Sequence, residues 1–316
     1  MTRAEKALRA PVPKAAPLSV ALAGRGIMAR RVAAWFRTAR DLLTQVDSVE
    51  DADVVFVVTH EEGGKRILSA VPDDDPRLWF DFTGYARQAG LGTSALGSLL
   101  PRSEPLPASR IVSMPGCYAS SIAIPLCYLS QNRTLDLVRV WATAVGGRST
   151  LGESKSIEED ALRTCSTEST NRHAHELRSL VGLAPERLDL RILVGDLGEG
   201  ILTSFGAHTS EHSLGIPPGT VRSVSLDLDC LTWRTEDLEP GSISDHCVRL
   251  GEGPSCAFLL QCSEDGATIQ GNCRLHNLDV PIGLAIGHLR RMEQSIGGGP
   301  ASREGARHLA QKIRSG

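Results

Sequence analysis

Ser113-Met114-Pro115-Gly116-Cys117-Tyr118-Ala119-Ser120-Ser121 is the stretch around which the chain is organised. A short strand leads into a Pro-Gly turn, the turn presents a cysteine, and small and apolar residues follow. This pattern predicts a helix that begins near Cys117. Because the N–H groups at a helix start favour negative charge, a thiol there loses its proton more easily and becomes a better nucleophile. The alternative interpretation is a small buried side chain without chemistry.

Upstream of this stretch, the sequence has the arrangement of a dinucleotide-binding turn. Residues 18–23 form a short apolar run typical of a buried parallel strand, and residues 30–40 have helical spacing. The G-x-G-x-x-A segment between them allows a tight turn and lets a pyrophosphate approach the helix N-terminus. The candidate cofactor contacts here are Gly24, Arg25, Gly26, Ile27 and Met28. The alternative is a glycine-rich turn of another α/β unit.

The part of the fold that would bind adenosine is abridged. A dinucleotide fold places a second strand, with a residue that contacts the ribose, about 20 residues further on. Here the segment of residues 41–47 is short, and residues 52–59 already form the next buried strand. Arg25, Arg30 and Arg31 are candidates to meet a 2′-phosphate. Thr59 and His60 follow the buried strand, where ligands bind in such sheets, so they are candidate cofactor neighbours.

The following segments extend both halves of the chain. Residues 78–83 predict another strand, and residues 86–108 predict a surface loop before the cysteine. Residues 137–145 alternate and run into Gly146-Gly147-Arg148, whose guanidinium suits a phosphate or carboxylate. The later segments that alternate like strands are 188–194, 200–208, 221–228, 256–261 and 267–275. They predict an α+β half with a mostly antiparallel sheet.

A histidine-rich segment begins another predicted helix at Asn171-Arg172-His173-Ala174-His175-Glu176. Histidine titrates near neutral pH, which suits acid–base catalysis by proton transfer. The alternative is a polar helix start, capped by Asn171, with no catalytic role.

Composition excludes several classes of protein. The 316 residues suffice for one or two domains with a sizeable core, and the net charge of −3 argues against a nucleic-acid or anionic-membrane binder. Residues 1–17 lack the apolar core of a secretory signal and predict a flexible tail. Eight cysteines without C-x-x-C spacing indicate reduced thiols in the cytoplasm and no structural zinc site.

Two motifs resemble those of one enzyme family. Pro115-Gly116-Cys117-Tyr118-Ala119 is similar to the active-site motif of the N-acetyl-gamma-glutamyl-phosphate reductases of arginine biosynthesis, relatives of aspartate-semialdehyde dehydrogenase. Arg172, His173 and Glu176 match that family's His-Arg-His-x-Pro-Glu motif, whereas Asn171 and His175 depart from it. Glu199 stands where the family usually has an arginine, which inverts the charge at this position and points to a substrate other than the family's standard one.

The resemblance implies an oxidoreductase that converts an acyl phosphate into a semialdehyde through a Cys117 thioester, with NADPH as reductant and a homodimer or homotetramer as the assembly. His173 would be the acid/base, with His175 as runner-up. The implied substrate contacts are Arg148, Arg172, His175 and Glu176, and the implied cofactor contacts include Gly146, Gly147 and Asn277. No metal is implied.

The predicted architecture is α/β. Residues 18–116 with 277–316 would form an abridged Rossmann-like, parallel-sheet domain that binds the dinucleotide, and 117–276 a catalytic and dimerisation domain. Three alternatives stay open. They are a specialised reductase of a different or carrier-bound amino acyl phosphate, a Cys/His acyltransferase or hydrolase, and a non-catalytic paralogue; the last two would work without a nucleotide.

Overall fold

The structure is a computed structural model. It describes residues 17–99, 109–130, 136–147, 163–166, 172–195, 197–198, 200–210, 216–227, 231–238 and 256–295. The tail predicted over residues 1–17 lies outside the described residues except for Pro17, and Arg148, Asn171 and Glu199 also lie outside them. No helix in the described ranges is both long and apolar enough to cross a membrane.

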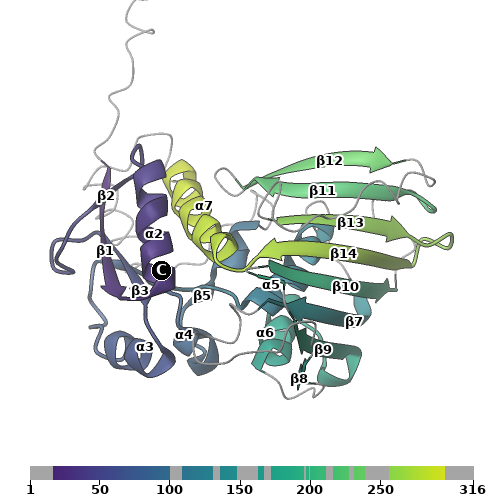
Figure 1. The fold of residues 1–316 in the computed structure, drawn as a ribbon, viewed down its shortest axis with the longest axis horizontal. Coiled ribbons are helices and arrows are strands. Elements are labelled where there is room, and N and C mark those ends of the chain that lie inside the picture. The colour runs from purple at the N-terminus through teal and green to yellow at the C-terminus, as the bar shows by residue number, and fades with distance from the viewer. Residues whose placement is uncertain are drawn as a thin grey trace, which may run out of the picture.

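The first half of the chain builds a sheet of six parallel strands in the order β2-β1-β3-β4-β6-β5 (Figure 1). The strands are β1 (Leu18–Gly24), β2 (Leu43–Gln45), β3 (Val54–Val58), β4 (Leu78–Asp81), β5 (Thr93–Ser94) and β6 (Ile111–Ser113). Every pairing in this sheet is parallel, which confirms the predicted Rossmann-like sheet.

Helices cover both faces of this sheet. They are α2 (Ile27–Thr38), α3 (Glu61–Leu68), α4 (Tyr85–Ala89) and the returning helix α7 (Asp279–Ser295), with a 3₁₀ turn, η1 (Ala95–Leu99). Because strand side chains alternate, Phe56 packs on the face of α2, where its ring centroid lies 5.0 Å from that of Phe36. Val55 and Val57 point the other way and pack with Leu68 of α3 and Ala86 of α4. Burial on both faces explains the continuous apolar run of β3.

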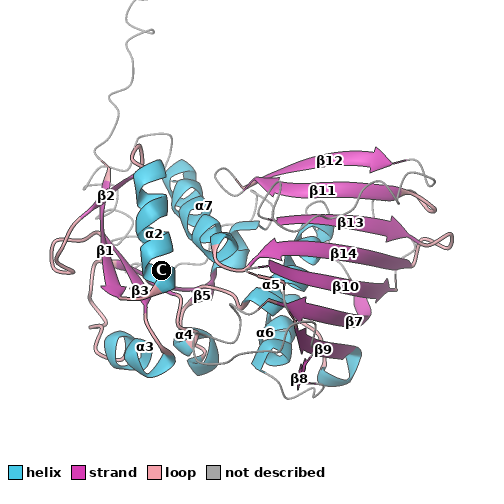
Figure 2. Ribbon diagram, viewed as in Figure 1, coloured by secondary structure: helices cyan, strands magenta, loops and turns pink. Residues whose placement is uncertain are grey.

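The second half builds a sheet of eight strands in the order β12-β11-β13-β14-β10-β7-β9-β8. The strands are β7 (Leu137–Gly146), β8 (Arg163–Ser166), β9 (Leu188–Val194), β10 (Gly200–Thr209), β11 (Val221–Asp227), β12 (Thr232–Leu238), β13 (Cys256–Cys262) and β14 (Thr268–His276). Among the described strands of this second sheet, only the β7–β9 pairing is parallel, so the prediction of a mostly antiparallel sheet is confirmed. Helices α5 (Cys117–Leu129) and α6 (Arg172–Val181) lie between the two sheets and pack on this one (Figure 2).

Two segments differ from the sequence-based expectation. The stretch 86–108 was expected to be a surface loop, but its described part holds most of α4, all of β5 and η1. The second strand, expected to be missing from 41–47, exists as the three-residue β2. Both strands are too short for hydrophobic periodicity to reveal them, because two or three residues cannot establish alternation.

Candidate active site

Cys117 is the first residue of α5, as the sequence predicts. Gly116 precedes it in an extended conformation, with φ −65° and ψ 145°. The helix behind the thiol is almost wholly buried, because its residues are small or apolar on every side. This burial holds the start of α5 in one place, at the junction between the two sheets.

His173 and Glu176, from α6, close around the start of α5. The backbone N–H of Gly116 donates to a Glu176 carboxylate oxygen at 2.7 Å. The Tyr118 and His173 rings meet edge to face, with centroids 5.2 Å apart. A β-carbon on Gly116 would lie 2.9 Å from His173 Nδ1 and 2.8 Å from Glu176 Oε2, so only glycine permits this approach. His173 and Glu176 therefore contact the residues on either side of Cys117.

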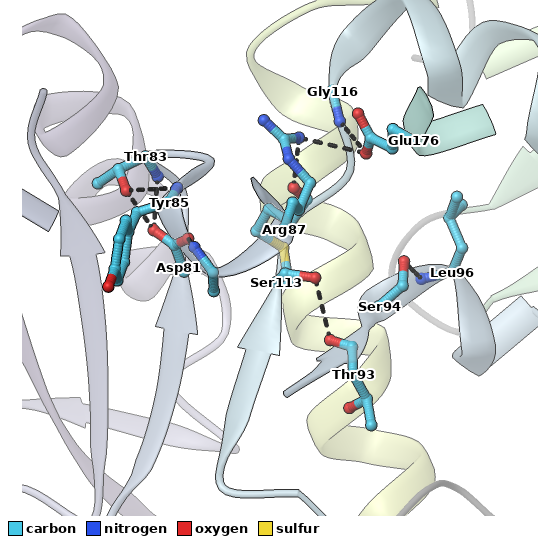
Figure 3. Close-up of polar contacts among 12 residues, drawn as sticks. Asp81, Thr83, Tyr85, Arg87, Thr93, Ser94, Leu96, Ser113, Gly116 and Glu176 are labelled. Carbon is cyan, nitrogen blue, oxygen red and sulfur yellow. Dashed lines mark hydrogen bonds and ion pairs between the residues drawn. The ribbon is translucent and has the colours of Figure 1, made fainter. Parts of the chain in front are cut away.

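Arg87 is a member of this site that sequence reasoning missed. Its Nη1 donates to the Met114 carbonyl at 2.6 Å and lies 3.3 Å from a Glu176 carboxylate oxygen (Figure 3). Its helix, α4, starts where the buried Asp81 carboxylate accepts the backbone N–H groups of Thr83 and Ala86. The usable signal was position: Arg87 follows the carboxyl end of a parallel strand, where such sheets bind ligands.

Burial raises the pKa of the Cys117 thiol to about 11. The backbone N–H of Tyr118 and the Arg87 guanidinium lower this pKa, whereas the Glu176 carboxylate raises it. The expectation of a lowered pKa is therefore wrong for this structure. The N–H groups at the helix start act in the expected direction, but the loss of solvation is larger than their effect. The thiol is protonated at neutral pH and needs a base to react.

This pKa predicts how the thiol reacts with iodoacetamide. We expect slow alkylation of Cys117 at neutral pH and a rate that rises about tenfold per pH unit from about pH 8 to 10, because the thiolate fraction rises in that proportion below the pKa. Glu176→Gln should speed the reaction and Arg87→Ala should slow it, because these charges act on the thiolate with opposite sign. Mass spectrometry of the peptide measures the rate. Fast alkylation that does not change between pH 7 and 9 would show a preformed thiolate.

The predicted dinucleotide turn has the geometry that its glycines suggest. Gly24 has φ +150°, and a β-carbon there would lie 1.8 Å from the Val58 carbonyl oxygen, so only glycine lets β1 end this close to β3. Gly26 has φ +105°, precedes α2 and has open space where a side chain would stand. The turn brings Gly24 beside Thr59, whose hydroxyl lies 3.1 Å from His60 Nδ1. Room above a glycine turn at a helix start fits a phosphate group.

The remaining members of this predicted set of cofactor contacts also lie near strand ends. Arg25 and Ile27 are exposed, and Met28 is half-buried at the start of α2. Arg31 is engaged elsewhere: its guanidinium binds Asp279 of α7 at 2.8 and 3.2 Å. A 2′-phosphate contact for Arg31 would therefore compete with this ion pair.

The other predicted contacts are three residues that the structure shows to be buried and two arginines whose side chains it does not describe. Gly146 and Gly147 are buried at the end of β7, and Gly147 donates its N–H to Gly200 at 2.8 Å. Asn277 is 9% exposed at the junction of β14 and α7. The side chains of Arg148 and Arg172 lie outside the described part of the structure, so their predicted roles stay predictions.

A cavity of about 490 Å³ adjoins the site between α4, β5, β6 and α6. Arg87, His175 and Glu176 form part of its wall, together with the hydroxyl-bearing Ser94 and Ser113. His175 is exposed, whereas His173 is 9% exposed and packed against Tyr118. The structure thus separates the two histidines of α6: His173 packs against the residues at the start of α5, whereas His175 lines the cavity.

Known proteins share this architecture. Aspartate semialdehyde dehydrogenase II from Vibrio cholerae superposes with a TM-score of 0.57, over 88% of this chain and 99% of that one, at 9% identity. A probable aspartate-semialdehyde dehydrogenase from Pseudomonas aeruginosa gives 0.58, over 89% and 99%, at 14% identity. In sequence, the chain is 24% identical over 196 residues to an N-acetyl-gamma-glutamyl-phosphate reductase of Salinispora arenicola (strain CNS-205).

The similarity to the reductase is partial. It spans 56% of this chain and 57% of the reductase, and no protein-family model matches the sequence. The fold is that of the aspartate-semialdehyde dehydrogenases over most of the chain. Among the described residues, no three His, Cys, Asp or Glu side chains are grouped to hold a metal ion.

Proposed function

We propose that this protein reduces an acyl phosphate to an aldehyde, with Cys117 as the nucleophile. The observation that carries the proposal is the position of Cys117. Cys117 begins a buried helix, and the residues next to it contact an imidazole and a carboxylate from α6 and a guanidinium from α4. A thiol, a base and a fixed cation in one place are the groups that acyl transfer to sulfur requires.

The chemistry begins with removal of the thiol proton, for which His173 is the base. The sulfur then attacks the acyl carbon, the carbon–oxygen bond to phosphate breaks, and inorganic phosphate leaves a Cys117 thioester. Arg87 is placed to stabilise the negative charge of the substrate near the thiol. A raised thiol pKa keeps the sulfur protonated until a substrate is bound beside the base.

A nicotinamide cofactor, which we propose to be NADPH, supplies a hydride when it is bound. Gly24 and Gly26 would hold its phosphate, and Thr59, His60, Gly146, Gly147 and Asn277 would line its nicotinamide side. His173 gives a proton to the substrate oxygen as charge develops there. It takes this proton back as the carbon–sulfur bond breaks and the aldehyde leaves, and passes it to the departing sulfur, which restores the thiol.

For the substrate, we propose a small acyl phosphate similar to N-acetyl-gamma-glutamyl phosphate. The cavity beside Arg87 and His175 supports this size, because about 490 Å³ suits a small molecule. We also propose the division into a dinucleotide domain, residues 18–116 with 277–316, and a catalytic and dimerisation domain, residues 117–276. We further propose that the protein assembles as a homodimer or homotetramer and acts in arginine biosynthesis in the cytoplasm.

The reverse reaction tests this function. With a semialdehyde and NADP⁺, formation of NADPH should require inorganic phosphate, because only phosphate can release the thioester as an acyl phosphate. Absorbance of the dihydronicotinamide measures it, and a panel of N-acetylglutamate and aspartate semialdehydes selects the substrate. If the forward reaction consumes acyl phosphate without oxidising any dihydronicotinamide, the protein is an acyltransferase or hydrolase instead.

A further inference from the structure

Strand β2 lies beside only the beginning of β1. Its three residues pair with Leu18, Ser19 and Val20, and its last contact is the bond from the Val46 N–H to the Val20 carbonyl at 2.9 Å. Strand β1 continues for four more residues to Gly24, paired there with β3. At a rise of about 3.3 Å per residue, β2 therefore ends about 13 Å before the glycine turn.

The chain beyond β2 turns away from the glycine turn. Val46 and Val49 pack under the sheet, against the cluster that includes Ala21 and Ala52. The Val49 carbonyl accepts a hydrogen bond from Arg77 at 3.0 Å, and Arg77 lies just before β4, at the amino edge of the sheet. Residues 46–53 thus lead back to the start of β3 rather than up to the carboxyl edge, where a cofactor binds.

This course matters because the end of the second strand normally recognises the adenosine ribose. An acidic residue there bonds the 2′-hydroxyl, or an arginine nearby accommodates the 2′-phosphate. Asp47 has the right place in the sequence, but it follows a strand that ends level with Val20. Arg31 is held by Asp279, to which Trp35 Nε1 also donates at 3.4 Å. Neither Asp47 nor Arg31 is therefore placed to bind the adenosine ribose, whereas the glycine turn has room for a phosphate.

We propose that this protein recognises its cofactor by the nicotinamide mononucleotide half and leaves the adenosine end outside the edge of β1. The proposal rests on the proposed function, because it concerns the same cofactor. Reduced nicotinamide mononucleotide then binds nearly as well as NADPH. The 2′-phosphate is not distinguished from a hydroxyl, so NADH and NADPH bind alike.

Direct binding tests this without turnover. Fluorescence titration should give dissociation constants for NADH and NADPH within about 3-fold, and for reduced nicotinamide mononucleotide within about 10-fold of NADPH, because few contacts are lost. In ³¹P NMR of bound NADPH, the pyrophosphate signals should shift while the 2′-phosphate keeps its free shift and pKa. Asp47→Ala should change no affinity, and Arg25→Ala, in the turn, should weaken all three ligands to the same extent.

Several results would overturn the proposal. They are a mononucleotide bound more than about 100-fold more weakly than NADPH, a shifted 2′-phosphate signal, or an Arg25→Ala loss confined to NADPH. In each of these cases NADPH still binds, and the proposed function stands. If none of the three dihydronicotinamides binds, the proposed function itself fails.

Discussion

Cys117→Ser is expected to lower the rate of aldehyde formation from an acyl phosphate by about 10⁴-fold or more, because a hydroxyl cannot replace the thiolate as a nucleophile. The serine hydroxyl is smaller than the thiol and occupies the same position at the start of α5, so the fold should remain. The measurement is the oxidation of NADPH together with trapping of the aldehyde. Trapped acyl-enzyme, seen by mass spectrometry as an added acyl mass on Cys117, should disappear in the variant.

Cys127→Ser is the matched control for this change. Cys127 lies in the same helix, and burial raises the pKa of its thiol to about 12. No charged group contributes to that shift, in contrast to Cys117, which is influenced by Arg87 and Glu176. Cys127→Ser should retain activity within about 3-fold, because substitutions away from the reacting atoms have small effects. Full aldehyde formation by Cys117→Ser would remove the thioester from the mechanism.

His173→Gln is expected to lower turnover by about 10²- to 10⁴-fold, because the reaction loses its acid/base. Glutamine keeps a polar side chain of similar reach against Tyr118 and beside Gly116, which limits damage to the packing. The affinity for the cofactor should stay within about 3-fold, since the imidazole acts on protons and not on the dinucleotide. Steady-state kinetics with a separate binding titration measures both quantities.

His175→Gln is the corresponding control, because it changes the same side chain two residues away. His175 is exposed and lines the cavity beside Arg87. Its loss should raise KM for the acyl phosphate by less than about 10-fold and leave kcat nearly unchanged, as expected for a group that binds but does not transfer protons. A large loss of kcat in His175→Gln, with His173→Gln active, would exchange the roles of the two histidines.

Local pattern was sufficient for the long elements of the fold. The run of β3 was recognisable because five consecutive apolar residues can be buried only between two layers of helices. The alternation in β9 predicted its bounds, because one of its faces packs and the other does not. The sequence pattern did not predict strands β2 and β5, because they are held by pairing with neighbouring strands and have no periodicity of their own.

The candidate site was predictable only in part, for the same reason. Cys117 and His173 stand in sequence patterns that mark helix starts, and the structure packs His173 against Gly116 and Tyr118, the residues on either side of Cys117. Arg87 stands in no such pattern. Its part in the site depends on Met114 and on Glu176, 89 positions further along the chain.

By itself, the sequence determined that a thiol would begin a buried helix, that a glycine turn would join a strand to a helix, and that two kinds of sheet would follow one another. Each of these depends on neighbours within a few residues. Only the tertiary structure decided the thiol's protonation state and the distance between β2 and the glycine turn. The pKa of a thiol depends on how much water the surrounding elements remove, and the position of a strand depends on the strand it pairs with. Neither property can therefore be predicted from a few neighbouring residues.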